Sequence, residues 1–197
     1  VGLMALFVGL IAVYSLLTIN RNKVWKTPLT LWSDVIEKSP NKARGYNNRG
    51  IMYNEAKKYD LALSDFNKAI ALQPKYATAF YNRGIAQQNK QNTQAAFQDF
   101  DQALKLDSTH VEAHNSRGLL HQSAQRFPAA LADYSKAIQL NPNYFKGYFN
   151  RGILFGMLNR SNEAMLDFDK AIALNPSLGD TYYNRAVVTF NQGNKEK

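Results

Sequence analysis

The sequence predicts an all-α protein in which antiparallel helix pairs stack in register behind one long apolar helix. The dipeptide Arg-Gly recurs at a constant interval of 34 residues, which indicates an internal repeat of one helix pair. Proline follows the second predicted helix of most repeats, and proline ends a helix because it cannot continue the backbone hydrogen bonds. Residues 1–18 carry no charge, unlike the rest of the chain.

Several other residue series keep the same period. The Arg-Gly pairs begin at Arg49, Arg83, Arg117 and Arg151, and Arg185-Ala186 continues them. The other series are Ala62, Ala96, Ala130 and Ala164; Ala69, Ala103, Ala137 and Ala171; the aromatics Phe66, Phe100, Tyr134 and Phe168; and Pro74, Pro142 and Pro176, with Ser108 in the remaining copy. Small residues let two helices approach closely, and large aromatics fill the space between pairs. A single pair cannot bury its apolar face, so stacked repeats supply the core.

These series resemble the tetratricopeptide repeat family from Ala43 to the C-terminus. The resemblance implies a right-handed superhelical solenoid with repeats at residues 43–76, 77–110, 111–144 and 145–178. Residues 179–197 would hold only the first helix of a fifth repeat, ending at the turn-like segment Gln192-Gly193-Asn194. Val187 and Phe190 would then lack a partner helix, as expected for a piece of a longer protein.

Residues 1–20 are long and apolar enough to predict a transmembrane helix. Roughly 18 to 20 residues at 1.5 Å each match a bilayer core of about 30 Å. A secretory signal peptide is disfavoured because no basic segment precedes the apolar run and no small-x-small cleavage site is evident. A buried soluble helix is disfavoured because it usually carries a polar stripe. An anchor and the last span of a longer membrane protein both fit.

Residues 21–42 predict a juxtamembrane linker and a lone helix that caps the array, with Trp32 in the aromatic position. Thr27 can cap this helix, Pro28 suits its first turn and Pro40 ends it. Arg21-Asn22-x-x-Trp25, Leu31-Trp32 and Ser39-Pro40-Asn41 resemble a junction in multi-span membrane proteins related to GT-C type glycosyltransferases. That resemblance covers residues 18–41 and implies that the catalytic acids lie upstream of this chain. A basic and aromatic membrane-interface anchor at Arg21, Lys23, Trp25 and Lys26 is the alternative.

Two indications of membrane sidedness disagree. Basic residues that follow the apolar segment place the repeats in the cytoplasm under the positive-inside rule. The junction resemblance places them outside the cytoplasm, in a periplasm or lumen. The positive-inside rule compares both flanks of a span, and this sequence contains only the flank that follows the apolar segment. We therefore give the rule less weight than the junction resemblance, favour the extracytoplasmic side and leave the cytoplasmic side open.

Composition excludes several function classes. The chain has no cysteine, which excludes disulfides and thiolate metal sites. Its net charge of +9 is scattered with acids between the basic residues, so a nucleic-acid partner is disfavoured. No phosphate loop, nucleophile elbow or zincin motif occurs, so we expect no enzyme activity, no cofactor and no metal in this chain.

Two sets of polar residues have a functional and a structural interpretation. His114 and His121 share one helix face near His110, and we interpret them as substitutes for packing aromatics rather than as zinc ligands. Asp99 and Asp101 are two residues apart, so they face different ways. The series Asp65, Asp99, Asp133 and Asp167 keeps step with the arginines of the Arg-Gly series. We favour repeating arginine–carboxylate pairs that fix helix register over a ladder of anion sites.

The family resemblance implies a concave groove lined by the first helices. The predicted groove residues are Asn47, Asn48, Tyr81, Asn82, Asn115, Phe149, Asn150, Tyr183 and Asn184, with Ser116 beside them. Amides can pair with an extended backbone, and aromatics add apolar contact. Alternatively, some of these amides bond only within the scaffold. Relatives that clamp a C-terminal carboxylate use positions that are apolar here, namely Ile51, Ile85, Leu119, Ile153 and Val187, which disfavours such a clamp.

The sequence therefore predicts a membrane-tethered scaffold that holds an extended peptide or protein segment in this groove. The alternative is an accessory, substrate-binding domain of a multi-span membrane glycosyltransferase whose catalytic part is absent from this chain. Many further apolar spans encoded upstream would favour the alternative.

Overall fold

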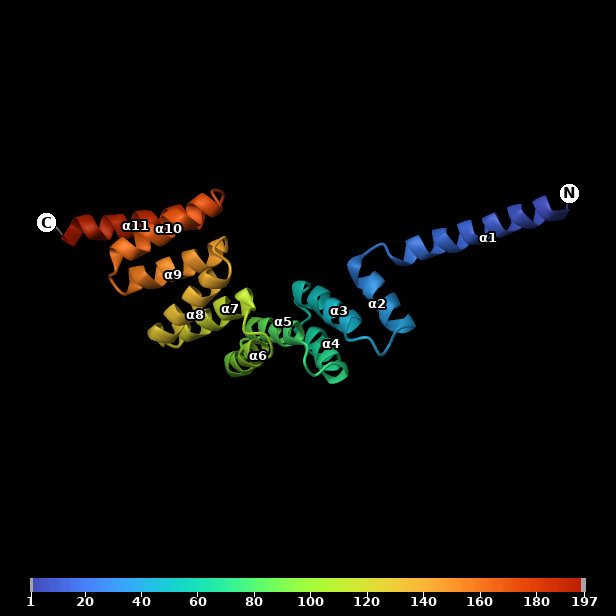
Figure 1. Ribbon diagram of the computed structural model, residues 1–197, viewed down its shortest axis with the longest axis horizontal. Coiled ribbons are helices and arrows are strands. Elements are labelled where there is room, and N and C mark those ends of the chain that lie inside the picture. Colours follow the sequence, from blue (N-terminus) through green and yellow to red (C-terminus); the bar gives the residue numbers. More distant parts are fainter. Residues whose placement is uncertain (1, 196–197) are drawn as a thin grey trace. The chain divides into compact units, whose positions relative to one another are not determined.

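A computed structural model describes residues 2–195 of the chain, and over these residues it contains eleven helices and no strand (Figure 1). The prediction of an all-α fold is confirmed. The helices are α1 (Gly2–Val24), α2 (Pro28–Lys38), α3 (Ala43–Glu55), α4 (Tyr59–Leu72), α5 (Ala77–Asn89), α6 (Thr93–Leu106), α7 (Val111–Ser123), α8 (Phe127–Leu140), α9 (Phe145–Met157), α10 (Ser161–Leu174) and α11 (Gly179–Lys195). They form two compact units, Val1–Asn92 and Thr93–Lys197. The superhelical hand of the whole array stays a prediction.

In the first unit, α3 and α4 pack as a pair, and α5 packs on α4. The pair is close because Gly50 has no side chain. A Cβ atom at Gly50 would lie 2.7 Å from the ring of Phe66, which is buried. The lone helix α2 packs on α3 through Ile36 and Gly45. It begins as predicted, because the Thr27 hydroxyl accepts a hydrogen bond from the backbone nitrogen of Thr30 at 3.2 Å.

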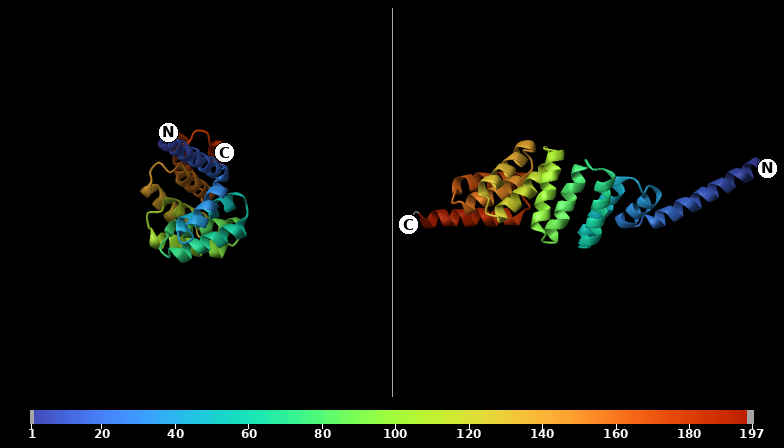
Figure 2. Two further views of the ribbon diagram at one scale, coloured as in Figure 1. Left: turned by 90° about the vertical axis from the view of Figure 1, so that its right-hand side faces the viewer. Right: turned by 90° about the horizontal axis from the view of Figure 1, so that it is seen from below.

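The second unit repeats this design. The pairs α7–α8 and α9–α10 lie side by side, and α11 packs on α9 and α10 (Figures 1 and 2). A Cβ atom at Gly118 would lie 2.7 Å from the ring of Tyr134, and one at Gly152 would lie 2.9 Å from the ring of Phe168. The aromatic series therefore packs directly on the glycine series, as the shared period predicts.

One local prediction is wrong. The segment Gln192-Gly193-Asn194, expected to form a turn, is helical, because α11 runs to Lys195. The residue after the helix and its cap has a positive φ of 56° to 64° after α3, α5, α7 and α9, at Lys57, Gln91, Gln125 and Asn159. In the pairs α3–α4, α7–α8 and α9–α10, a second helix packs on the first and holds this turn. Among the described residues, no such helix packs on α11.

The helix α1 packs on α2, and its described apolar side chains are exposed. Among the residues whose side chains the structure describes, no helix is both long and apolar enough to cross a membrane. The transmembrane prediction for residues 1–20 is therefore not confirmed. The structure does not describe the side chains of residues 3, 5, 20, 23 and 24 in α1. Residue 1 of the predicted transmembrane helix and residues 196–197 of the predicted fifth repeat also lie outside the described residues.

Candidate functional site

The predicted groove residues of the first unit form a chain of amide hydrogen bonds. The Asn82 side-chain nitrogen donates to the Asn47 side-chain oxygen at 3.0 Å, which links α5 to α3. The Asn47 nitrogen donates in turn to the Asn48 oxygen at 3.1 Å. Asn47 is only 2% exposed, so its amide is occupied within the scaffold. Tyr81, Asn82 and Asn48 are half-buried and present part of their surface to solvent.

The second unit has the same kind of link. The Asn150 nitrogen donates to the oxygen of Asn115 at 2.8 Å, and Asn115 is 4% exposed. Phe149 is half-buried against the core, with its ring centroid 6.5 Å from that of Phe168. Tyr183 is 71% exposed.

The nine predicted groove residues thus divide into two groups. Asn47 and Asn115 are buried and join neighbouring first helices, which is the structural alternative left open for some of these amides. The exposed and half-buried members are Asn48, Tyr81, Asn82, Phe149, Asn150, Tyr183 and Asn184. The peptide-binding role of the set stays a prediction.

The predicted arginine–carboxylate pairs form in three repeats. Both bonds of each pair are between 2.7 and 2.9 Å, for Arg49–Asp65, Arg117–Asp133 and Arg151–Asp167. Each of these aspartates is 5% exposed. Two parallel hydrogen bonds fix the angle between the two groups, so each pair holds its first and second helix in one register.

The preceding second helix is also contacted by Arg83, Arg117 and Arg151, which the sequence analysis missed. The Nη1 atom of Arg117 lies 3.1 Å from Asp101, and that of Arg151 lies 3.0 Å from the hydroxyl of Ser135. In the first unit, Arg83 Nη1 donates to Asn67 at 2.7 Å. The signal was present: a polar residue recurs 16 positions before each of these arginines. One guanidinium therefore connects successive repeats.

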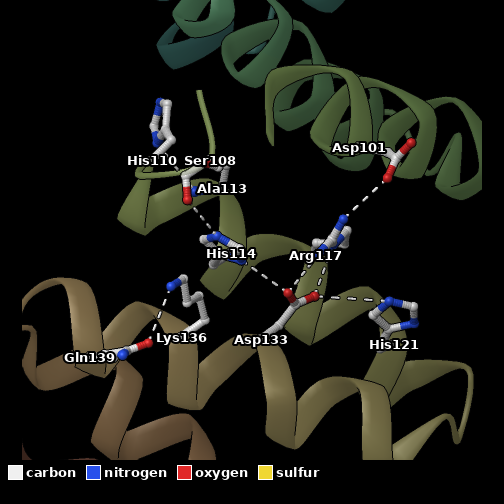
Figure 3. Close-up of polar contacts among 10 residues, drawn as sticks. All are labelled: Asp101, Ser108, His110, Ala113, His114, Arg117, His121, Asp133, Lys136 and Gln139. Carbon is white, nitrogen blue, oxygen red and sulfur yellow. Dashed lines mark hydrogen bonds and ion pairs between the residues drawn. The ribbon is translucent and has the colours of Figure 1, made fainter. Parts of the chain in front are cut away.

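The third repeat adds histidines to this pattern, and Figure 3 shows the resulting cluster. The Nδ1 atom of His114 lies 3.0 Å from a carboxylate oxygen of Asp133, and its Nε2 atom lies 3.1 Å from the backbone oxygen of Ser108. His114 of α7 therefore links Asp133 of α8 to the backbone that precedes α7. His114 is thus part of a buried polar network, which the aromatic-substitute interpretation did not foresee.

His121 retains the packing role that was predicted for it. Its ring packs edge-on against the ring of Phe97, with 5.0 Å between the ring centroids. Its Nε2 atom lies 3.9 Å from a carboxylate oxygen of Asp133. Among the described residues, no group of three or more histidine, cysteine or acidic side chains is placed to hold a metal ion. Burial raises the pKa of Asp133, but hydrogen bonds from His114 and Arg117 outweigh burial and hold that pKa below its ordinary value.

Sequence models described as tetratricopeptide repeat match residues 43–76, 77–110, 111–144 and 133–165. The chain belongs to the tetratricopeptide repeat family. No curated protein matches it. None of the comparisons supports the junction resemblance of residues 18–41 to glycosyltransferase-related membrane proteins, which stays a prediction.

Solved tetratricopeptide repeat structures share the fold. The structure of YrrB, described as a TPR protein with an unusual peptide-binding site, is 24% identical, with 84% of this chain and 85% of that chain covered and a TM-score of 0.68. PilF of Pseudomonas aeruginosa is 20% identical, with 77% of this chain and 69% of that chain covered and a TM-score of 0.72. A tetratricopeptide repeat protein of Parabacteroides merdae is 22% identical, with 89% of this chain and 69% of that chain covered and a TM-score of 0.69. At these identities the likeness shows the fold alone. Tetratricopeptide repeats suggest a protein–protein interaction scaffold, and proteins of this fold are generally non-enzymatic.

We expect the stability of this tetratricopeptide array to fall at acidic pH because of His121. Burial lowers the pKa of His121 from 6.5, and Arg126 and Arg117 lower it further, while Asp133 partly offsets them. The unfolded chain therefore takes up the proton more readily than the folded chain. The contribution to stability is complete above pH 6.5 and is lost as the pH falls through 6.5 toward the folded-state pKa.

Urea unfolding at pH 7.5 and at pH 5.5 measures this effect. His121→Phe, which copies Phe155 of the next repeat, should reduce the loss of stability on acidification, whereas His110→Gln should leave it in place. An unchanged loss in His121→Phe would contradict the assignment to His121.

Proposed function

We propose that this chain is a membrane-tethered scaffold that binds an extended protein segment along the concave row of its first helices. The observation that carries the proposal is the exposed aromatic and amide surface of the second unit. Tyr183 is 71% exposed on α11, beside Asn184, and Asn150 lies half-buried on α9. A rigid exposed aromatic supplies contact area at low conformational entropy cost, and amides pair with backbone donors and acceptors.

The charges on this face favour a neutral segment. Glu112, Lys146 and Asp180 hold equivalent places on α7, α9 and α11, three residues before the predicted groove residues. Residues three apart share a helix face, so the three charges lie along the groove and alternate in sign. A strongly charged segment would gain little electrostatic attraction from charges that alternate in sign. The same alternation disfavours binding of nucleic acid, which is strongly negative.

The tether is proposed from the sequence of the first segment. Residues 1–20 contain no charged residue, and the apolar side chains of α1 are exposed, Leu6, Phe7 and Tyr14 to 67% each. The junction after α1 is held in place, because the Trp25 ring nitrogen donates to Asp34 at 3.0 Å and Arg21 lies 4.8 Å from the Trp25 ring. Tryptophan and arginine are typical of the membrane interface.

Replacing Tyr183 by alanine should weaken segment binding by about 1–2 kcal/mol without unfolding the array. Peptides selected by display against the full chain in detergent micelles provide the ligands, and fluorescence anisotropy measures their affinity. Tyr182→Ala is the matched control, because Tyr182 lies next in sequence but lines a hollow with Met165 and Arg185 on another face. Equal losses in the two variants, or no selected peptide, would contradict the proposal. Phe149→Ala is a poorer probe than Tyr183→Ala, because Phe149 packs on the core.

We further propose that the repeats lie on the extracytoplasmic side of the membrane. Protease added to intact cells with a permeabilised outer membrane should then degrade them before the inner membrane is broken. Repeats that survive until the inner membrane is broken would place them in the cytoplasm instead. Removal of residues 1–20 serves as the control for the tether, because it should release the repeats from the membrane fraction.

A further inference from the structure

We propose that a hollow between α9 and α11 is a pocket for one aliphatic side chain of the bound segment, and that two asparagines beside it hold the segment's backbone. The inference rests on the proposed function and names the residue that the groove selects. The hollow has a volume of about 220 Å3, with Ile153 and Met157 of α9 and Val187 and Val188 of α11 in its wall. Pockets for whole small molecules measure roughly 300–1,000 Å3, so this one fits a single side chain.

Gly156 opens the pocket. The equivalent places on α3 and α7 hold Asn54 and Gln122, whose side chains are engaged with Asn89 at 3.1 Å and with the hydroxyl of Tyr134 at 2.7 Å. At Gly156 no side chain fills this space. A Cβ atom there would lie 3.2 Å from a methyl group of Val188, so even one carbon would enter the hollow.

Asn184 and Asn191 also border the hollow and suit an extended backbone. They lie seven residues apart on α11, which is about 10.5 Å along a helix. Three residues of an extended chain span about 10 Å, so the two amides can meet backbone groups on either side of one anchor residue. The Asn184 nitrogen donates to the backbone oxygen of Asp180 at 2.7 Å. Among the described residues, its oxygen and the whole amide of Asn191 have no such bond.

The occupant is therefore an extended, neutral segment with one aliphatic anchor. The wall excludes a charged anchor, because burying a charge without a partner is costly. Lys146 and Asp180 offset each other at equivalent places on α9 and α11, so charge on the flanks of the anchor adds little.

The test uses capped peptides of the sequence Ser-Thr-Asn-Thr-X-Thr-Asn-Thr-Ser, where X is Leu, Ala, Phe or Glu. Binding to the full chain in detergent micelles is followed by anisotropy and by the NMR shifts of the Ile153 and Met157 methyl groups. The Leu peptide should bind about ten-fold more tightly than the Ala peptide, as expected for burial of an aliphatic side chain, and the Glu peptide should bind most weakly.

Two variants and a control locate the effect. Gly156→Gln places in the pocket the side chain that α7 carries there and should abolish the preference for Leu over Ala. Met157→Ala widens the pocket and should shift the preference from Leu to Phe, which is a gain that a folding defect cannot produce. Met165→Ala removes a methionine of α10 that lines the separate hollow beside Tyr182, and it should leave the preference unchanged.

The outcomes separate this inference from the proposed function. If display-selected peptides lose affinity in Tyr183→Ala but Leu and Ala peptides bind alike, the pocket is wrong and the scaffold function stands. Equal affinity of the Leu and Phe peptides for Met157→Ala, or a retained Leu preference in a folded Gly156→Gln, would overturn the pocket as well. If neither selected nor designed peptides bind, both are overturned.

Discussion

Replacing Asp133 by asparagine is expected to lower the free energy of unfolding by about 3 kcal/mol. Asp133 is 5% exposed and accepts hydrogen bonds from Arg117 and His114. Asparagine keeps the shape but loses the charge, and its amide nitrogen cannot accept a hydrogen bond. The guanidinium of Arg117 would then stay half-buried with Asp101 as its remaining carboxylate, which keeps the loss at the lower end of the range for buried pairs.

Asp169→Asn provides the comparison for this prediction. Asp169 pairs with Arg185 at 2.8 Å, but its side chain is 54% exposed, so we expect a loss below about 0.5 kcal/mol. Chemical denaturation of both variants, monitored by helical circular dichroism, measures the difference. Similar losses of unfolding free energy in Asp133→Asn and Asp169→Asn would show that burial does not determine how much the cluster in Figure 3 contributes to stability.

Gly118→Ala is expected to destabilise the array by about 2 kcal/mol, even though alanine is the better helix former. A Cβ atom at Gly118 would lie 2.7 Å and 2.9 Å from two ring carbons of Tyr134. Tyr134 is fully buried, and its hydroxyl donates to Gln122 at 2.7 Å, so the ring has no room to move away. The two helices must therefore separate, and the loss of packing exceeds the gain in helix propensity.

Gly193→Ala tests whether the clash, rather than any change at a glycine, is responsible. Nothing lies within 4 Å of a Cβ atom at Gly193, and the residue lies within α11. This variant should raise helix stability by up to about 1 kcal/mol. If Gly118→Ala were as stable as the parent chain in thermal unfolding, the close approach of α7 and α8 would not be required for stability.

The sequence predicted the helix pairs well because each repeat poses the same packing problem. A glycine and an aromatic 16 residues apart must meet wherever two helices approach, so Gly118 and Tyr134 could be paired from their spacing alone. Arginine and aspartate recur with the same separation, so their pairing could be predicted in the same way.

Periodicity could not predict how deeply each groove residue is buried. Asn47 and Tyr81 hold equivalent positions, yet Asn47 is buried and Tyr81 is half-buried, because burial depends on the neighbouring first helix. The contact between His114 and the backbone oxygen of Ser108 could not be predicted either, because every residue has a backbone oxygen. The helical course of Gln192-Gly193-Asn194 was missed because a turn there requires a second helix to hold it.

The backward reach of the arginines has a consequence for cooperativity in the unit Thr93–Lys197. Arg117 contacts α6 and α8, and Arg151 contacts α8 and α10, so each guanidinium spans a boundary between repeats. In a linear array, the sharpness of melting depends on how strongly neighbours are coupled relative to the stability of each repeat. Unfolding of one repeat would remove a hydrogen-bond partner of the arginine in the next repeat. Partially melted states of this unit should therefore be sparsely populated, and its helices should melt in a single transition.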